Sequence, residues 1–140
     1  MDQDRISSYR ETQIKTASKG TLVVLLYDGL IRFIDTAVEN LPKKKYDIVN
    51  ENILKAQDIL SELILALNFD AGDISHRLFN IYTFLNTKLI EGNVKKDVAP
   101  LKFVRSMANE LRDAWSKIAN KGGAPDLKEM KKEGGIDIAG

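Results

Sequence analysis

The sequence predicts an all-α protein, an antiparallel four-helix bundle in up-down-up-down order, and three observations support this. Apolar residues recur at helical spacing in four long segments. The three prolines fall where helices should start or stop, as a bundle requires. No segment alternates apolar and polar residues between hairpin turns, as paired strands do. Because the four segments are of similar length and closely spaced, neighbouring helices are expected to run antiparallel.

The first predicted helix covers residues 20–41 and follows Ser18, its expected N-cap. A serine hydroxyl can accept a hydrogen bond from a free amide of the first turn. Pro42 and the three lysines after it end the helix, and cations suit a helix C-terminus. The expected core stripe of this helix consists of Leu22, Leu26, Leu30, Phe33 and Ala37.

The second predicted helix covers residues 47–67 and is followed by a turn that contains Gly72. Its expected core stripe consists of Ile53, Ala56, Leu60, Leu63, Ile64 and Leu67. The third predicted helix begins at Asp73 or Ser75, runs to Gly92 and ends at a C-cap formed by Gly92 and Asn93. Its stripe consists of Ile74, Leu78, Ile81, Tyr82, Leu85 and Leu89.

The fourth predicted helix has Asp97 as its N-cap and Pro100 in its first turn, where a missing amide is harmless. It runs to about Lys121, and its stripe consists of Val104, Ala108, Leu111, Trp115 and Ile118. Residues 1–121 are therefore expected to form a single domain. Residues 122–140 are rich in glycine and predict a flexible tail, in which a short helix is compatible with the sequence.

The composition excludes several classes of function. The 21 basic and 20 acidic residues nearly cancel, so the chain has no broad electrostatic attraction to nucleic acid or to an anionic membrane. The absence of cysteine excludes disulfides, a thiolate nucleophile and a cysteine-ligated zinc site. The N-terminus lacks the apolar region of a signal peptide, and no apolar run is long enough to insert into a membrane. We therefore expect a cytoplasmic protein.

The first two predicted helices carry more apolar residues than the roughly three per heptad that a bundle helix needs. Two interpretations remain open. The connections and an N-terminal arm, residues 1–17, could cover the surplus, or the surplus could form a groove for an amphipathic partner. Both hold if the arm leaves when the partner binds. The apolar anchors of the arm are Ile6, Tyr9 and Ile14.

The sequence shows no clear catalytic, metal or cofactor site. His76 is the only histidine and is expected to be an ordinary polar residue. The competing interpretation is a histidine phosphotransfer bundle, but Arg77, Phe79 and Asn80 surround His76 instead of the expected small residues and lysine. Asp28 fits either a solvent-facing residue or a contact in a binding face. A helical adaptor with another protein ligand is a further alternative.

Four motifs occur in order along residues 5–120. They are Tyr9 with Thr16-Ala17-Ser18 and Leu26-Tyr27-Asp28-Gly29, then Asn50 to Leu60 with Lys55-Ala56-Gln57, then Leu78, Tyr82, Leu89, Asn93 and Asp97, and finally Leu111-Arg112-Asp113-Ala114-Trp115. Together they resemble the FliS family of flagellin export chaperones. The chain departs from the family pattern at three places. Lys19 stands where the family often has proline, and Gly92 stands where it usually has alanine. Ala71-Gly72-Asp73-Ile74 replaces a run that is usually of Gly-Gly-Glu-Ile type.

The resemblance implies a chaperone without enzymatic activity that binds the disordered C-terminal segment of flagellin. Such a chaperone prevents premature polymerisation and delivers flagellin to the flagellar type III export apparatus. The resemblance also implies docking of the loaded chaperone on the export gate protein FlhA and, in some relatives, contact with the regulator FliW.

The expected flagellin groove combines the second and third predicted helices, although some of its candidate residues must belong to the core. The candidates are Ile53, Ala56, Gln57, Leu60, Ile64, Ile81, Leu85, Asn86 and Leu89. The expected displaceable cap consists of Ile6, Tyr9 and Ile14.

Overall fold

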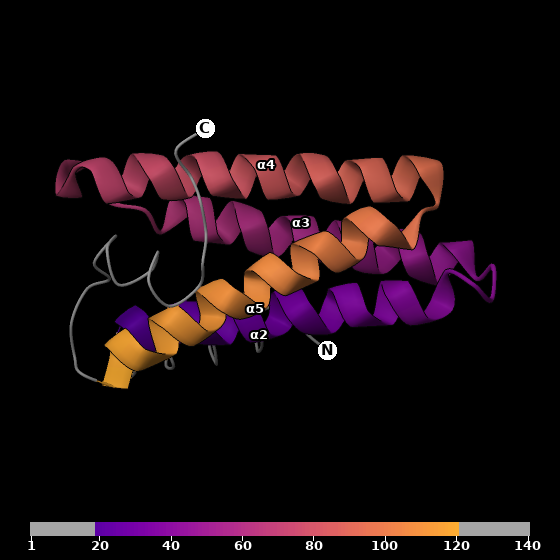
Figure 1. The fold of residues 1–140 in the computed structure, drawn as a ribbon, viewed down its shortest axis with the longest axis horizontal. Helices are drawn as coiled ribbons and strands as arrows, with labels where there is room; N and C mark the ends of the chain where they lie inside the picture. The colour runs from indigo at the N-terminus through magenta and orange to yellow at the C-terminus, as the bar shows by residue number, and fades with distance from the viewer. Residues whose placement is uncertain (1–18, 121–140) are drawn as a thin grey trace, which may run out of the picture.

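The structure, a computed structural model, describes residues 19–120 and contains four long α-helices and one short 3₁₀ helix in that range (Figure 1). The elements are α2 (Lys19–Asn40), α3 (Tyr46–Leu65), η1 (Phe69–Ala71), α4 (Asp73–Lys95) and α5 (Val98–Asn120). The predicted all-helical bundle is confirmed. The predicted cap residues Ile6, Tyr9 and Ile14, the N-cap Ser18 and the tail 122–140 lie outside the described residues.

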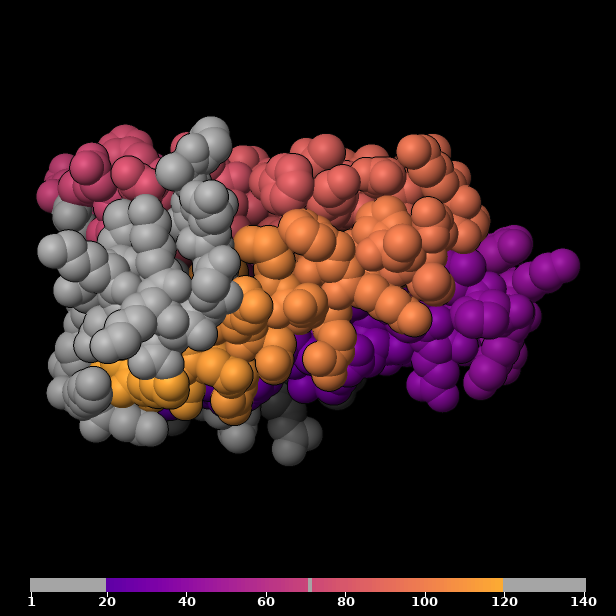
Figure 2. Space-filling view, in the orientation of Figure 1, coloured from indigo at the N-terminus to yellow at the C-terminus, as the bar shows by residue number. Residues whose placement is uncertain are grey.

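The four helices surround one core. α2 packs against α3 and α5, and α4 packs against the same two helices, so α2 and α4 occupy opposite corners of the bundle. Figure 2 shows the side on which α4 and α5 meet, with the connection between α2 and α3 projecting at one end. Among residues 19–120, no helix combines the length and the apolar character needed to cross a membrane.

The buried stripe of α2 differs from the predicted one. Its buried apolar residues are Val23, Tyr27, Leu30, Ile34 and Ala37. Leu22, Leu26 and Phe33 are only half-buried. Leu26 and Phe33 pack against the edge of the core, and the Phe33 ring lies under Lys55 of α3. The prediction was wrong at these positions because two overlapping apolar rows run along α2. The positions of α3 and α5, and not the sequence spacing, decide which row faces the centre.

The buried stripe of α3 agrees better with the prediction, although the helix ends two residues earlier, at Leu65. Ile53, Ala56 and Leu60 are fully buried. The turn after α3 is formed as expected: the Asn68 side chain accepts a hydrogen bond from the Asp70 amide at 3.1 Å, and Gly72 adopts a φ of +96°. That φ is one that glycine accepts without strain.

The end of α4 was predicted wrongly. Gly92 is buried inside the helix, which continues to Lys95 and is capped by Lys96 in a left-handed conformation with φ of 51°. A Cβ at Gly92 would lie 2.6 Å from Leu101 Cδ2, so this glycine permits close packing of α5 on α4. The start of α5 agrees with the prediction, since the Ala99 amide donates to Asp97 Oδ1 at 3.0 Å.

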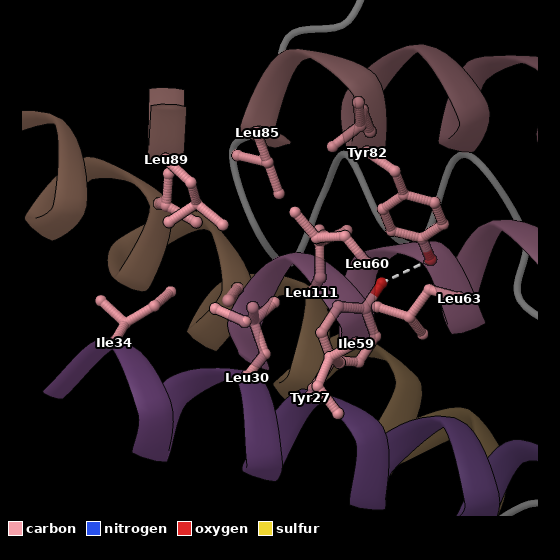
Figure 3. Close-up of a cluster of buried hydrophobic side chains, with 14 of the residues drawn as sticks. Tyr27, Leu30, Ile34, Ile59, Leu60, Leu63, Tyr82, Leu85, Leu89 and Leu111 are labelled. Atoms are coloured by element: carbon pink, nitrogen blue, oxygen red, sulfur yellow. Dashed lines mark hydrogen bonds between the residues drawn. The ribbon is translucent and has the colours of Figure 1, made fainter. Parts of the chain in front are cut away.

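In the described part of the chain, two tyrosine hydroxyls meet among the apolar side chains of the core (Figure 3). The hydroxyls of Tyr27 on α2 and Tyr82 on α4 are 2.6 Å apart and form a buried hydrogen bond. We call these two residues the tyrosine pair. Burial, the largest cause, raises the pKa of both hydroxyls because it disfavours the phenolate. Trp115 Nε1 is buried without a hydrogen bond of good geometry. The indole N–H favours the Tyr27 phenolate and therefore offsets a small part of the rise in the Tyr27 pKa.

Candidate functional site

The nine predicted groove residues separate into core and surface groups. Six of them are buried in the core of the described chain: Ile53, Ala56, Leu60, Ile81, Leu85 and Leu89. Gln57, Ile64 and Asn86 are partly exposed and lie where α3 meets α4. The surface that a partner can reach on this side is therefore built by these three residues and by their exposed neighbours.

A hydrogen bond between side-chain amides joins the two helices at the centre of this surface. Gln57 Nε2 on α3 donates to Asn86 Oδ1 on α4 at 2.9 Å. Seven residues is nearly two helical turns, so residues seven positions away lie on the same face. This spacing places Asn50 and Ile64 on either side of Gln57, and Asn93 and Phe79 on either side of Asn86. We call the six residues the α3/α4 seam: Asn50, Gln57, Ile64, Phe79, Asn86 and Asn93.

One end of the seam is polar and held by a lysine. Lys96 Nζ donates to the Oδ1 atoms of both Asn50 and Asn93, the latter at 2.6 Å. The same ammonium lies 5.5 Å from the centre of the Tyr46 ring, which adds a cation–π contact. Lys96 therefore connects the N-terminal part of α3, through Tyr46 and Asn50, to the last turn of α4.

The other end of the seam is apolar and aromatic. Phe79 is 38% exposed, and its ring centre lies 6.0 Å from that of Phe69 in the connection between α3 and α4. Phe69 also contacts the exposed His76 ring, with the ring centres 5.1 Å apart. His76 thus takes part in an aromatic cluster. In residues 19–120, no group of three or more His, Asp or Glu side chains is arranged to hold a metal ion.

Exposed apolar side chains border the seam, and the sequence prediction of the groove does not include them. Ile90 lies one turn from Asn86 and is 45% exposed, and Leu54 and Val94 are more exposed still. Large apolar side chains left in water mark surfaces that bind other molecules when they gather in one area. The sequence did contain a signal for this exposure. Each of the three residues is displaced from the buried stripe of its own helix, by one position or by about half a helical turn.

A different surface, between α2 and α5, is charged. Arg112 Nε donates to Asp28 Oδ1 at 2.7 Å, and Arg105 Nε donates to Asp35 Oδ1 at 2.8 Å. These bonds raise the pKa of both guanidinium groups, because the carboxylates favour the charged form. Asp28, for which two roles were open, therefore forms a half-exposed ion pair within the bundle.

Comparison with known proteins identifies the family. Residues 1–122 match the family model described as "Flagellar protein FliS". The chain belongs to the FliS family. A FliS relative from Bacillus subtilis, named as a flagellar secretion chaperone, is 29% identical over 134 residues, which cover 96% of this chain and 97% of the relative. The relative of that name from Vibrio cholerae is 28% identical over 109 residues, covering 77% and 80%.

FliS proteins are chaperones of flagellar secretion and not enzymes. The phosphotransfer interpretation of His76 is therefore abandoned. A third relative with the same name, from Escherichia coli, is 23% identical over 107 residues, covering 75% of this chain and 79% of the relative. The four-helix bundle described above is consistent with this assignment.

Proposed function

We propose that this protein is a cytoplasmic export chaperone for flagellin. It binds the disordered C-terminal segment of flagellin, prevents premature polymerisation, and delivers the subunit to the flagellar type III export apparatus. The loaded chaperone docks on the export gate protein FlhA, and FliW is a further partner. Membership of the FliS family and the names of the relatives support this proposal.

The location of the site rests on the exposed apolar side chains in and beside the α3/α4 seam. Phe79 in the seam is 38% exposed, and Ile90 and Leu54 beside it are 45% and 57% exposed, which is unfavourable for large apolar side chains unless a partner covers them. The amides of Gln57 and Asn86 lie between these side chains. An apolar surface with a few fixed polar groups is typical of a site for a polypeptide segment.

We also infer that neighbouring helices alternate in direction. On α2 and α5, Asp28 pairs with Arg112 and Asp35 pairs with Arg105. The residue numbers therefore increase along α2 while those of the partners on α5 decrease, as in antiparallel helices. On α3 and α4, Gln57 meets Asn86, while Asn50 and Asn93 share one lysine. The course of the colours along the helices in Figure 1 also supports the up-down-up-down order.

Binding couples to folding of the guest. A disordered segment that folds on binding typically buries about 1,000–3,000 Å², and its ordering offsets part of the gain. The core candidates, such as Leu60 and Leu85, contribute only where the guest separates α3 from α4. Ile6, Tyr9 and Ile14 act as the cap that the guest displaces.

Calorimetry with a peptide of the flagellin C-terminal segment tests this function. Phe79→Ala on the seam and Phe103→Ala on α5 form a matched pair, because the two rings are 38% and 41% exposed. Phe103 packs against Phe84 away from the seam, with ring centres 5.8 Å apart. We expect Phe79→Ala to weaken binding about tenfold and Phe103→Ala to change it less than twofold, since truncation of a buried aromatic anchor often costs more than about 1.4 kcal/mol. No binding of the peptide at micromolar concentration would reject the function.

A further inference from the structure

An exposed aromatic pair lies between α4 and α5, outside the α3/α4 seam. Phe84 on α4 is 47% exposed and Phe103 on α5 is 41% exposed. Their ring centres are 5.8 Å apart, and the rings meet edge to face at 86°. We call these two residues the phenylalanine pair. Large apolar side chains from two helices that gather in water mark a surface that another segment can cover.

The charges beside the phenylalanine pair do not balance. Lys88 Nζ lies 5.6 Å from the centre of the Phe84 ring and 3.3 Å from Glu91 Oε1. Lys95 Nζ lies 3.7 Å from the other carboxylate oxygen of Glu91. Two ammonium groups therefore share one carboxylate, which leaves a surplus of positive charge. A segment that brings apolar side chains together with a carboxylate is complementary to this face.

We propose that residues 133–140 of this chain fold back on the α4/α5 face and cover the phenylalanine pair. These residues lie outside the described part of the chain, and their sequence is Glu-Gly-Gly-Ile-Asp-Ile-Ala-Gly. The segment has two acidic residues and no basic residue, whereas residues 121–132 have four lysines and two acidic residues. Of these two stretches, residues 133–140 are thus the one that combines apolar side chains with a net negative charge.

The spacing of the two isoleucines in this segment fits the phenylalanine pair. Ile136 and Ile138 lie on the same side of an extended chain, because side chains alternate, and they are about 6.6 Å apart along it. That spacing is close to the 5.8 Å between the two ring centres, so each isoleucine can contact one ring. Asp137 between them and Glu133 before them bring negative charge toward the two ammonium groups, which strengthens the contact at low salt.

The chain between α5 and this segment is long enough to reach the pair. Phe103 lies about 26 Å before Asn120 along the axis of α5, at a rise of about 1.5 Å per residue. Residues 121–135 can extend about 50 Å, so they reach the pair without being fully stretched. Gly122 and Gly123 permit the reversal of direction, since glycine adopts turn conformations without steric cost. Because the segment is tethered, its effective concentration is high and a weak contact is enough to keep it bound.

A second copy of the chain is a less favourable occupant of this face. In a symmetric dimer the same patch meets itself, so Lys88 and Lys95 of one copy would face the same residues of the other. Like charges that oppose each other across a contact are unfavourable. The guest of the proposed function is placed on the α3/α4 seam, so this inference does not depend on that function.

Paramagnetic broadening in NMR spectra tests the inference and needs no guest. The chain contains no cysteine, so Ala139→Cys gives a single site for a nitroxide spin label beside the two isoleucines. In the whole isotope-labelled chain, amide signals around Phe84 and Phe103 should be at least twofold weaker with the active label than with the reduced label. Amide signals around Phe33 and Lys55, which meet between α2 and α3, should change least.

The apolar part of the contact is tested by two pairs of substitutions in the spin-labelled protein. Ile136→Ser combined with Ile138→Ser should abolish the broadening around the phenylalanine pair. Leu127→Ser combined with Met130→Ser is the matched control, because it removes two apolar side chains from the preceding part of the chain. The control should keep the broadening. All four substitutions lie outside the bundle core, so the fold of residues 19–120 stays intact in each variant.

The acidic part of the contact is tested in the same way at low salt. Glu133→Gln combined with Asp137→Asn should reduce the broadening, and Asp126→Asn combined with Glu129→Gln should leave it unchanged. Equal broadening in the isoleucine variant and its control, or broadening spread evenly over the bundle, would overturn the inference. So would broadening of an isotope-labelled wild-type chain by a separate spin-labelled chain, because that result would assign the face to a second copy.

Discussion

Removal of one hydroxyl of the tyrosine pair should destabilise the bundle more than removal of both. Tyr27→Phe leaves the Tyr82 hydroxyl buried without its partner at 2.6 Å. An unsatisfied buried polar group costs about 1–3 kcal/mol, whereas replacement of both partners by apolar groups of the same shape is nearly neutral. The rings themselves stay in place, with centres 6.4 Å apart. Each single variant should therefore lose about 1–3 kcal/mol and the double variant about 1 kcal/mol or less.

Urea unfolding followed by circular dichroism measures all four proteins of this cycle. With a slope that the substitutions leave unchanged, the shift in the midpoint gives the change in the free energy of unfolding. The coupling between the two hydroxyls should be at least about 1 kcal/mol and opposite in sign to the single losses. If the losses of the two single variants simply add in the double variant, the hydrogen bond does not satisfy these hydroxyls and the reasoning is refuted.

Three further predictions follow from the described contacts. Because the pKa of both tyrosine hydroxyls is raised on folding, their contribution to the free energy of unfolding is complete below pH 10 and declines above it. The decline should reach up to about 1.4 kcal/mol per pH unit for each hydroxyl. Urea titrations at alkaline pH of the wild type and of the double Phe variant will measure it. Gly92→Ala should lower the free energy of unfolding by about 1–3 kcal/mol despite the better helix propensity of alanine, because the new Cβ would lie 2.6 Å from Leu101. An unchanged melting temperature would contradict the close packing. Asp28→Asn should cost less than about 1 kcal/mol in low salt and almost nothing in 1 M salt, because its partner Arg112 is partly exposed and the ion pair is screened.

The candidate site was only partly predictable. The sequence pointed to the second and third predicted helices and included Gln57 and Asn86, whose amides do meet. It could not show that Leu85 and Leu89 face the core in the described chain while Phe79 and Ile90 stay in water. Periodicity marks the apolar side of one helix, but the edge of that side depends on where the neighbouring helices lie.

Local spacing, capping chemistry and short motifs were enough to predict the helical class, most of the helix limits, the Asp97 cap and the family before any contact between helices was known. The packing of the helices against one another sets which apolar row of α2 is buried and explains why α4 runs through Gly92. It also decides that Tyr27 and Tyr82, which are 55 residues apart, share one hydrogen bond. Contacts of this kind form between distant segments, so their partners are fixed only when the helices pack together.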